Sequence, residues 1–254
     1  MNGDALSKRL NELALRAAHT GAPCFSRFLE PSQRDDARAA ANRAGARATF
    51  YGGYEDAERV IAAFYDGDAP EAGDYPIRAL RIEWNAKFAN PGHRDLLGAA
   101  MGLGVERETM GDIAMGEYKG GRCAYLFAHA DMADYVAASL TGAGRASVKA
   151  SVAAEKPSLL PPEGVELRLT VQQERLDAVL AAACRLSRSE AQRLVAAGLV
   201  KLNHAINTRA DAKLEPGDLI SARGYGRIRV DGFQGQSRRG RLIVAAFKYG
   251  GNGK

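Results

Sequence analysis

Donor side chains gather in the last third of the chain at spacings that favour contact with phosphate oxygens. Arg188 and Gln192 are four residues apart, as are Ser189 and Arg193, and this spacing places the four side chains in one stripe along a helix. Guanidinium, amide and hydroxyl groups are common partners of the phosphate backbone of nucleic acids. The pattern therefore indicates a surface for a phosphate-rich ligand.

Two short amphipathic helices are predicted to carry these side chains. Apolar residues recur at helical spacing in both, at Leu176, Val179, Leu180 and Ala183 and again at Ala191, Leu194, Val195 and Leu199. Ser187 and Glu190 have the spacing of a capping box, so the second helix is expected to begin near Arg188. Gly198 follows its last turn and can end it in the left-handed conformation.

A small sheet is expected to follow the second helix. Residues 200–203 alternate apolar and polar, as a strand does, and residues 219–222 can pair with them after the turn at 217–218. Further donors in and after these strands extend the predicted surface: Lys201, Asn203, Arg223, Arg227 and Arg229.

The charge distribution supports a polyanionic partner for this region. Residues 174–254 contain fifteen Lys and Arg against seven Asp and Glu, whereas residues 1–173 contain twenty against twenty-three. Neutralising phosphates releases counterions, so binding is expected to weaken steeply with salt. A basic membrane surface is the competing explanation, and the sequence shows no cationic amphipathic helix with a large apolar face to favour it.

Residues 174–229 resemble the RNA-binding domain first described in ribosomal small-subunit protein four, the S4 domain. The resemblance rests on five motifs in order, R-L-D at 175–177, S-R-S at 187–189, Gln192-Arg193, G-L-V-K-L-N at 198–203 and G-D-L-I at 217–220. It implies that Arg188, Gln192, Arg193, Lys201 and Asn203 contact structured RNA. We add Arg175, from the first motif, to this predicted interface.

Proline and glycine positions predict the domain boundaries. The proline-rich stretch 155–164 is expected to be a linker, and Pro70, Gly73 and Pro76 mark a second one. We therefore expect an α+β, multidomain protein with a small α-rich N-terminal domain (1–75), a middle domain (76–154) and the S4-type domain with a C-terminal extension (165–254).

The middle domain is predicted to be ferredoxin-like, as in many RNA-binding modules. Strands are expected at 77–84, 112–117, 122–128 and 146–152, with helices at 93–101 and 132–140, which gives the order β-α-β-β-α-β. Tyr125 and Phe127 do not complete an aromatic stacking signature for RNA, so we expect both in the core.

The sequence also predicts the elements at the two ends of the chain. An amphipathic helix is expected around Leu6, Leu10 and Leu13, and further helical structure at 25–31 leading into 33–44 and at 56–65. After the S4-type domain, residues 228–230 and 242–247 are predicted to form an antiparallel pair across a loop at 232–240, with Arg238, Arg239 and Arg241 at its tip or base.

Taken whole, the chain resembles the bacterial YlmH family of RNA-binding proteins. The specific parts are F-L-E-P at 28–31, G-Y-x-x-A-E-R at 53–59, L-G-V-E-R-E-T-M-G-D-I at 103–113 and R-G-Y-G-R at 223–227. The resemblance implies ribosome association and a role in ribosome quality control, in which large subunits still carrying peptidyl-tRNA are processed. Related plant and cyanobacterial proteins are associated with photosystem maintenance.

Other classes of site are not predicted. Cys24, Cys123 and Cys184 are single and far apart, and the four histidines form no close pair, so we expect no disulfide, no metal and no cofactor. No apolar run approaches the roughly twenty residues of a membrane span. The N-terminus lacks a secretory pattern, and Asp4 and Glu12 disfavour a transit peptide. We therefore expect a cytoplasmic protein.

The sequence thus predicts a non-enzymatic protein that docks on ribosomal RNA or tRNA, with the large ribosomal subunit as its expected partner. Two alternatives stay open. One is an RNA-modifying enzyme, because S4-type domains accompany pseudouridine synthases and some methyltransferases. The other is a regulatory or scaffold protein, of cell division or photosystem maintenance, whose N-terminal half binds a protein partner.

Overall fold

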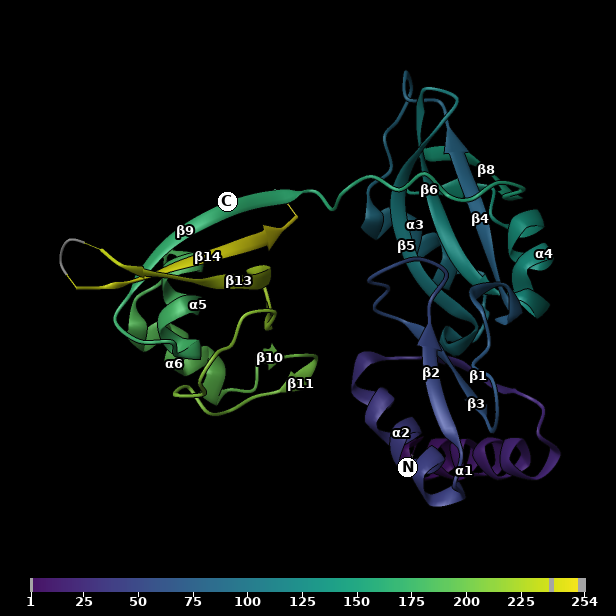
Figure 1. Ribbon diagram of the computed structural model, residues 1–254. Coiled ribbons are helices and arrows are strands. Elements are labelled where there is room, and N and C mark those ends of the chain that lie inside the picture. Colours follow the sequence, from purple (N-terminus) through teal and green to yellow (C-terminus); the bar gives the residue numbers. More distant parts are fainter. Residues whose placement is uncertain (1, 238–239, 251–254) are drawn as a thin grey trace. The chain divides into compact units, whose positions relative to one another are not determined.

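The computed structural model describes residues 2–237 and 240–250 and divides into two compact units, 1–161 and 162–254 (Figure 1). Helix and sheet are mixed in several domains, as predicted. The helices of the described residues are α1 (Asn2–Thr20), α2 (Arg34–Ala44), α3 (His93–Met101), α4 (Ala130–Ser139), α5 (Leu176–Cys184) and α6 (Arg188–Ala196). The strands are β1 (Cys24–Leu29), β2 (Arg47–Tyr51), β3 (Val60–Tyr65), β4 (Ile77–Trp84), β5 (Met110–Tyr118), β6 (Gly121–His129), β7 (Gly142–Ala143), β8 (Ala146–Val152), β9 (Gly164–Val171), β10 (Val200–Leu202), β11 (Ala205–Ile206), β12 (Leu219–Ala222), β13 (Gly226–Gln236) and β14 (Leu242–Tyr249).

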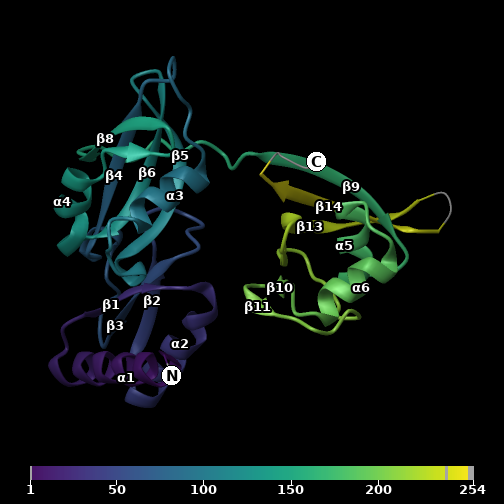
Figure 2. The ribbon, with the colours of Figure 1, turned by 180° about the vertical axis from the view of Figure 1, so that it is seen from behind.

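The N-terminal part of the first unit is a small helix-on-sheet layer. Its three strands pair antiparallel in the order β1-β3-β2, and α1 and α2 pack together on one side of them (Figure 2). Leu10 and Ala14 of α1 meet Ala40 of α2 and Phe64 of β3 in a shared core. The amphipathic N-terminal helix was predicted correctly, and it extends beyond the predicted stretch.

Two of the predicted helical segments are strands instead. Residues 24–29 form β1, and the second half of the segment 56–65 forms β3, whose six residues are all buried. A short apolar run that is buried on both faces has no alternation to distinguish it from a buried helix, so its spacing misled the prediction. The β-branched and aromatic residues Val60, Ile61 and Phe64 were the available signal.

The middle of the first unit has the predicted elements in the order β-α-β-β-α-β, with one additional two-residue strand, β7, between α4 and β8. Its sheet runs β5-β6-β4-β8-β7, with antiparallel neighbours throughout. Apolar residues of α3 and α4, such as Leu96 and Val136, pack with Leu80 and Leu126 against one face of it. Each predicted element is present with its ends within two residues of the prediction.

The other face of this sheet packs against the N-terminal part. Tyr125 and Phe127 are only 1% exposed and lie in one cluster with Phe28, Ile61 and Ala63. Their predicted place in the core is confirmed. The N-terminal and middle segments therefore share a hydrophobic core within the first unit.

The chain leaves the first unit through a segment that is bound to the sheet. Glu117 N donates to Ser158 O at 2.9 Å, and Leu160 N donates to Met115 O at 2.9 Å, so residues 158–160 run beside β5. The division between the two units falls immediately afterwards, between two consecutive prolines.

The second unit places two helices on one face of a six-stranded sheet. The sheet order is β11-β10-β12-β13-β14-β9, with every pair antiparallel. Leu180 of α5 and Val195 of α6 pack onto Ile220, Ile228 and Val244. The predicted pairings of 200–203 with 219–222 and of 228–230 with 242–247 are both present. Of the arginines predicted at the hairpin loop, Arg241 is exposed, whereas Arg238 and Arg239 lie outside the described residues.

None of the helices formed by residues 2–237 and 240–250 is long and apolar enough to cross a membrane.

Candidate nucleic-acid interface

A buried carboxylate organises the donors at the N-terminal ends of α5 and α6. Asp177, in the first turn of α5, is fully buried. Its Oδ2 accepts hydrogen bonds from Gln192 Nε2 at 2.8 Å and from Arg188 Nε at 3.2 Å. Arg175 donates through Nε to Oδ1 and through a terminal nitrogen to Oδ2, both at 3.1 Å. Three predicted interface residues are thus brought together around a single acceptor.

The protonation state of Asp177 follows from the balance of burial and these hydrogen bonds. Burial by itself raises the pKa of the carboxyl group, whereas the hydrogen bonds from Gln192, Arg175 and Arg188 lower it, and the net pKa lies below its ordinary value. Asp177 is therefore ionised at neutral pH, and a negative charge holds the two guanidinium groups in place.

The start of α5 is fixed by a loop from later in the sequence. No side chain caps the helix. Instead, the amides of Leu176 and Asp177 donate to the carbonyls of Ala212 and Ala210, at 2.9 and 3.0 Å. These bonds satisfy amides that a helix leaves without an internal partner. The loop at 210–212 thus helps to position the Asp177 carboxylate.

Helix α6 begins and ends as predicted. Ser187 Oγ accepts from Glu190 N at 3.2 Å, and the Glu190 carboxylate accepts from Ser187 N at 2.8 Å, which completes the capping box. Gly198 has φ +68°, and the amide of Leu199 donates to Leu194 O, which closes the last turn. The helix therefore has fixed ends.

The stripe predicted on α6 is solvent-accessible. Ser189, Gln192 and Arg193 are exposed, and the Arg188 side chain is 43% exposed although it contacts Asp177. The α6 face, defined here as Arg175, Arg188, Ser189, Gln192 and Arg193, is a set of donors that is partly held in position and open to a ligand.

The predicted strand residues lie elsewhere on the second unit. Lys201, Arg227 and Arg229 alternate with the buried residues Val200, Ile228 and Val230. Because successive side chains of a strand point to opposite faces, these three lie on the sheet face opposite the helices. The structure thus divides the predicted interface into the α6 face and the open sheet face.

Asn203 and Arg223 occupy turns between strands. Asn203 has φ +48°, its Nδ2 donates to Asp218 Oδ1 at 2.7 Å, and its Oδ1 accepts from Leu219 N at 2.9 Å. This amide group therefore ties two turns of the domain together. Arg223 is exposed, and its backbone amide donates to Leu199 O.

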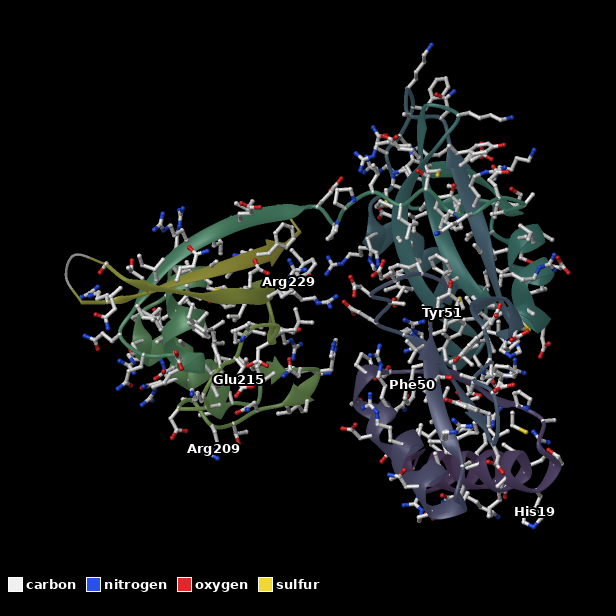
Figure 3. All side chains as sticks on the ribbon, viewed as in Figure 1. His19, Phe50, Tyr51, Arg209, Glu215 and Arg229 are labelled. Carbon is white, nitrogen blue, oxygen red and sulfur yellow. The ribbon has the colours of Figure 1, made fainter. Side chains whose placement is uncertain are left out.

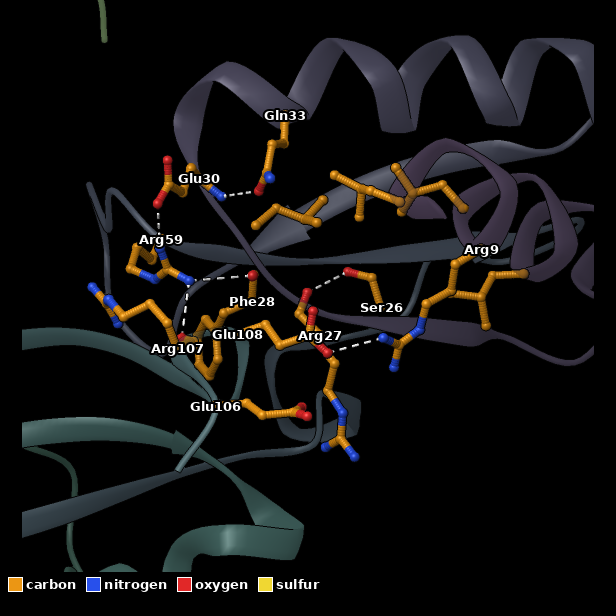
Figure 4. A pocket seen from close by; sticks show the side chains of 14 residues that line it. Arg9, Ser26, Arg27, Phe28, Glu30, Gln33, Arg59, Glu106, Arg107 and Glu108 are labelled. Carbon is orange, nitrogen blue, oxygen red and sulfur yellow. Dashed lines mark hydrogen bonds and ion pairs between the residues drawn. The ribbon is translucent and has the colours of Figure 1, made fainter. Parts of the chain in front are cut away.

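The first unit contains a pocket of about 470 Å³ between α1, β1 and the turn at 106–108 (Figure 4). Arg59, which is 6% exposed, lines it. Its guanidinium donates to the carbonyls of Met110, Phe28 and Arg107 and pairs with Glu30 at 3.3 Å. These contacts hold loops of the N-terminal and middle segments together, which is a structural role.

The acidic residue of the G-D-I motif is also structural. Asp112 accepts from the backbone amides of Glu58 and Arg59 and from Tyr54 Oη at 3.1 Å. Burial raises the pKa of Asp112, although the backbone hydrogen bonds oppose the rise. Asp112 thus anchors the loop that leads into β3.

Within the described residues, no group of three or more His, Cys, Asp or Glu side chains is placed to hold a metal ion.

Comparison with known proteins matches two separate stretches of the chain to family models. Residues 174–220 match the S4 domain model, and residues 70–156 match the model described as "Putative RNA-binding domain in YlmH". The chain is 37% identical over 223 residues to "Ribosome-associated protein quality control protein P2" of Bacillus subtilis (strain 168), an alignment that covers 85% of this chain and 84% of that protein. The chain belongs to the YlmH family. A solved structure described as "Cell division protein ylmH from Streptococcus pneumoniae" is 22% identical, with a TM-score of 0.47, and covers 60% of this chain and 92% of that one.

The S4 match in this YlmH chain covers the α6 face but not the whole second unit. Arg175, Arg188 and Gln192 lie within it, whereas Arg223, Arg227 and Arg229 follow its end at residue 220. The spacing of these donors in the sequence predicted the candidate interface. The sequence indicated the R-L-D motif at 175–177, but it did not predict that the Asp177 carboxylate gathers three donors.

Proposed function

We propose that this YlmH-family chain is a non-enzymatic RNA-binding protein that docks on structured RNA, ribosomal RNA or tRNA, through the α6 face. The observation that carries the proposal is the buried Asp177 carboxylate, which orients Arg175, Arg188 and Gln192 at an exposed helix surface. Donors whose positions are fixed before binding lose less freedom when the ligand arrives. Phosphate contacts supply most of the affinity, and RNA shape supplies most of the selectivity.

We further place the protein on the large ribosomal subunit in the cytoplasm, where it acts on subunits that retain peptidyl-tRNA after stalling. The support is the relative from Bacillus subtilis, whose name states ribosome association and protein quality control. The basic excess of residues 174–254 suits a partner that is rich in phosphate. Lys201, Asn203, Arg223, Arg227 and Arg229 extend the proposed contact beyond the α6 face.

Binding of the full-length protein to a structured RNA, at salt concentrations from about 50 to 200 mM, tests the α6 face. If six to ten phosphates are contacted, affinity of the wild type falls about a thousandfold or more over this range. Replacing Arg188 and Arg193 together with Ala weakens binding at low salt and makes the salt dependence shallower. Unchanged affinity of this double variant overturns the assignment.

A matched control removes two exposed arginines from helices of the first unit. Arg38 lies on α2 and Arg94 on α3. The Arg38→Ala, Arg94→Ala double variant carries the same net charge as the Arg188→Ala, Arg193→Ala variant. Its RNA affinity should stay close to wild type. An equal loss in both double variants means that net charge, and not the α6 face, controls binding.

Sedimentation of cell extract through a sucrose gradient tests the ribosomal part of the proposal. Migration with free large subunits, together with crosslinks to tRNA and adjoining ribosomal RNA, supports it. Absence from ribosomal fractions, with partners that survive nuclease digestion, overturns it in favour of a scaffold role.

A further inference from the structure

The open sheet face of the second unit carries an aromatic pair beside two arginines. Phe247 and Tyr249 of β14 alternate with the buried residue Ala246, and Arg227 and Arg229 of β13 alternate with Ile228. Both sets therefore point away from α5 and α6. Arg229 can be located in Figure 3.

Cross-strand register brings these four side chains together. Arg227 is opposite Tyr249, and Arg229 is opposite Phe247. The two rings meet edge to face, with centroids 5.0 Å apart and planes at 82°. Arg229 donates to Tyr249 Oη at 3.2 Å, and its guanidinium carbon lies 5.5 Å from the Phe247 centroid.

The guanidinium groups lie over the two rings, and the two aromatic residues remain partly accessible. The guanidinium carbon of Arg227 lies 5.4 Å from the Tyr249 centroid, close to the roughly 6 Å limit of a cation–π contact. Phe247 and Tyr249 are half-buried, and the Arg229 side chain is 44% exposed. The partial exposure of the two aromatic residues leaves surface that a flat ligand can contact beside the cationic groups.

Basic charge continues across the same sheet face. Arg227 is paired with Ser221, and Ser221 is paired with Lys201, so a row of side chains runs from β14 to β10. Among the described strand residues, acidic side chains on this face include Asp231, which accepts from Arg229 at 2.6 Å, and Glu166, which is paired with Phe247 near the sheet edge. The row of paired residues Tyr249, Arg227, Ser221 and Lys201 thus contains two cations and no carboxylate.

We propose that this open sheet face is a second RNA site, which stacks unpaired bases on Phe247 and Tyr249 and holds the adjoining phosphates on Arg227 and Lys201. Aromatic side chains on a basic sheet are the features with which proteins hold single-stranded RNA. Paired bases inside a duplex present no free ring face to such a platform. The site therefore takes single-stranded RNA, in contrast to the structured RNA proposed for the α6 face, and it lies mostly beyond the S4 match.

Binding of the full-length protein to an unpaired oligoribonucleotide of about eight residues, measured by fluorescence anisotropy, tests the proposal. The Phe247→Leu, Tyr249→Leu double variant keeps apolar volume but removes both rings, and it should lose at least about tenfold in affinity. The slope of log affinity against log salt should not change in this variant, since no phosphate contact is removed. Arg227→Ala should make the same slope shallower.

A matched control and a direct reporter accompany these variants. Tyr135→Leu removes a half-exposed ring from α4 of the first unit and should leave oligonucleotide affinity unchanged. Phe247→Trp places an indole at the proposed platform, and its fluorescence should be quenched when the oligonucleotide binds. The wild-type chain, whose single tryptophan is Trp84, gives the background signal.

The outcome is decided by comparing single-stranded and hairpin RNA. A loss confined to single-stranded RNA, in a variant whose circular dichroism and melting temperature match wild type, supports base stacking. The proposal is overturned if the Phe247→Leu, Tyr249→Leu variant binds the oligonucleotide as tightly as wild type, or if it loses equal affinity for single-stranded and hairpin RNA. It is also overturned if the oligonucleotide does not quench the Phe247→Trp fluorescence beyond the wild-type background. The Arg188→Ala, Arg193→Ala variant is measured in parallel and is expected to weaken the binding of hairpin RNA. Failure of the α6-face proposal would therefore appear with hairpin RNA, whereas failure of the sheet-face proposal would appear with single-stranded RNA.

Discussion

Arg188 Nε lies 3.2 Å from the buried Oδ2 of Asp177, a residue eleven positions earlier and on the other helix of the pair. The contact uses the inner nitrogen of the guanidinium, and the terminal nitrogens are the part that we propose meets phosphate. A buried, ionised carboxylate therefore controls where a side chain of the proposed RNA interface points.

Replacing Asp177 with Asn should weaken binding of structured RNA without removing any basic residue. Arg175, Arg188 and Gln192 donate to the two carboxylate oxygens of Asp177. The Asn side chain has only one acceptor oxygen, and its N–H groups would face these donors. Leaving buried polar groups unsatisfied costs about 1–3 kcal/mol, so the free energy of unfolding should fall by about that amount. Denaturant titration and RNA affinity measure the two effects, with Asp211→Asn as the control because Asp211 is exposed. Wild-type affinity in Asp177→Asn contradicts the prediction.

The stabilising effect of Asp177 should depend on pH with a defined sign. Its pKa is lower in the folded protein than the value of about 3.9 expected for the unfolded chain. The contribution is therefore fully present above about pH 4 and is lost as pH falls through the folded pKa. The difference in unfolding free energy between wild type and Asp177→Asn should be constant near neutrality and shrink below about pH 4. A difference that grows on acidification contradicts this assignment.

Removing the cap of α6 should loosen the helix that carries the interface. Ser187→Ala deletes the hydroxyl that accepts from Glu190 N and should cost about 1 kcal/mol of unfolding free energy. Ser189→Ala is the matched control, because its hydroxyl contacts Ser187 but does not cap the helix. Chemical denaturation of both variants measures the difference, and equal losses would show that the capping bond is not the cause.

Two glycines with positive φ should respond very differently to Ala. At Gly45, with φ +70°, an added Cβ has no neighbour within 4 Å, so the cost is the conformational strain of roughly 1–2 kcal/mol. At Gly53, with φ +100°, the Cβ would lie 2.2 Å from Phe127 Cδ1, in the ring stack with Tyr54. Overpacking should add about 1–3 kcal/mol to the strain at Gly53. Thermal denaturation compares the two, and a similar loss in both variants would contradict this packing argument.

Local rules were sufficient to predict much of the fold from the sequence. The serine cap and glycine end of α6 depend on residues a few positions apart, and so do the strand and helix boundaries between residues 77 and 152. The buried strand β3 was misread because its environment, and not its periodicity, decides its conformation.

The parts of the site that the sequence did not reveal depend on long-range pairing. The predicted donors included Arg227 and Arg229, but their aromatic neighbours became visible only through the register of β13 with β14. The position of Asp177 at the centre of three donors requires α5 and α6 to be packed together. The residue types could suggest ion pairs and cation–π contacts. Which residues are close enough to form them is determined by the packing of the helices and the register of the strands.

The packing of β6 limits how the middle domain can meet RNA. Leu126 points into the core with α3 and α4, while Tyr125 and Phe127 point into the core with Phe28 and Ile61. Modules of this element order that stack bases use an uncovered sheet. Here the inner strand β6 is enclosed on both sides, so its side chains are not a surface on which bases can stack, and any contact of this part of the chain with nucleotides must be made by other residues.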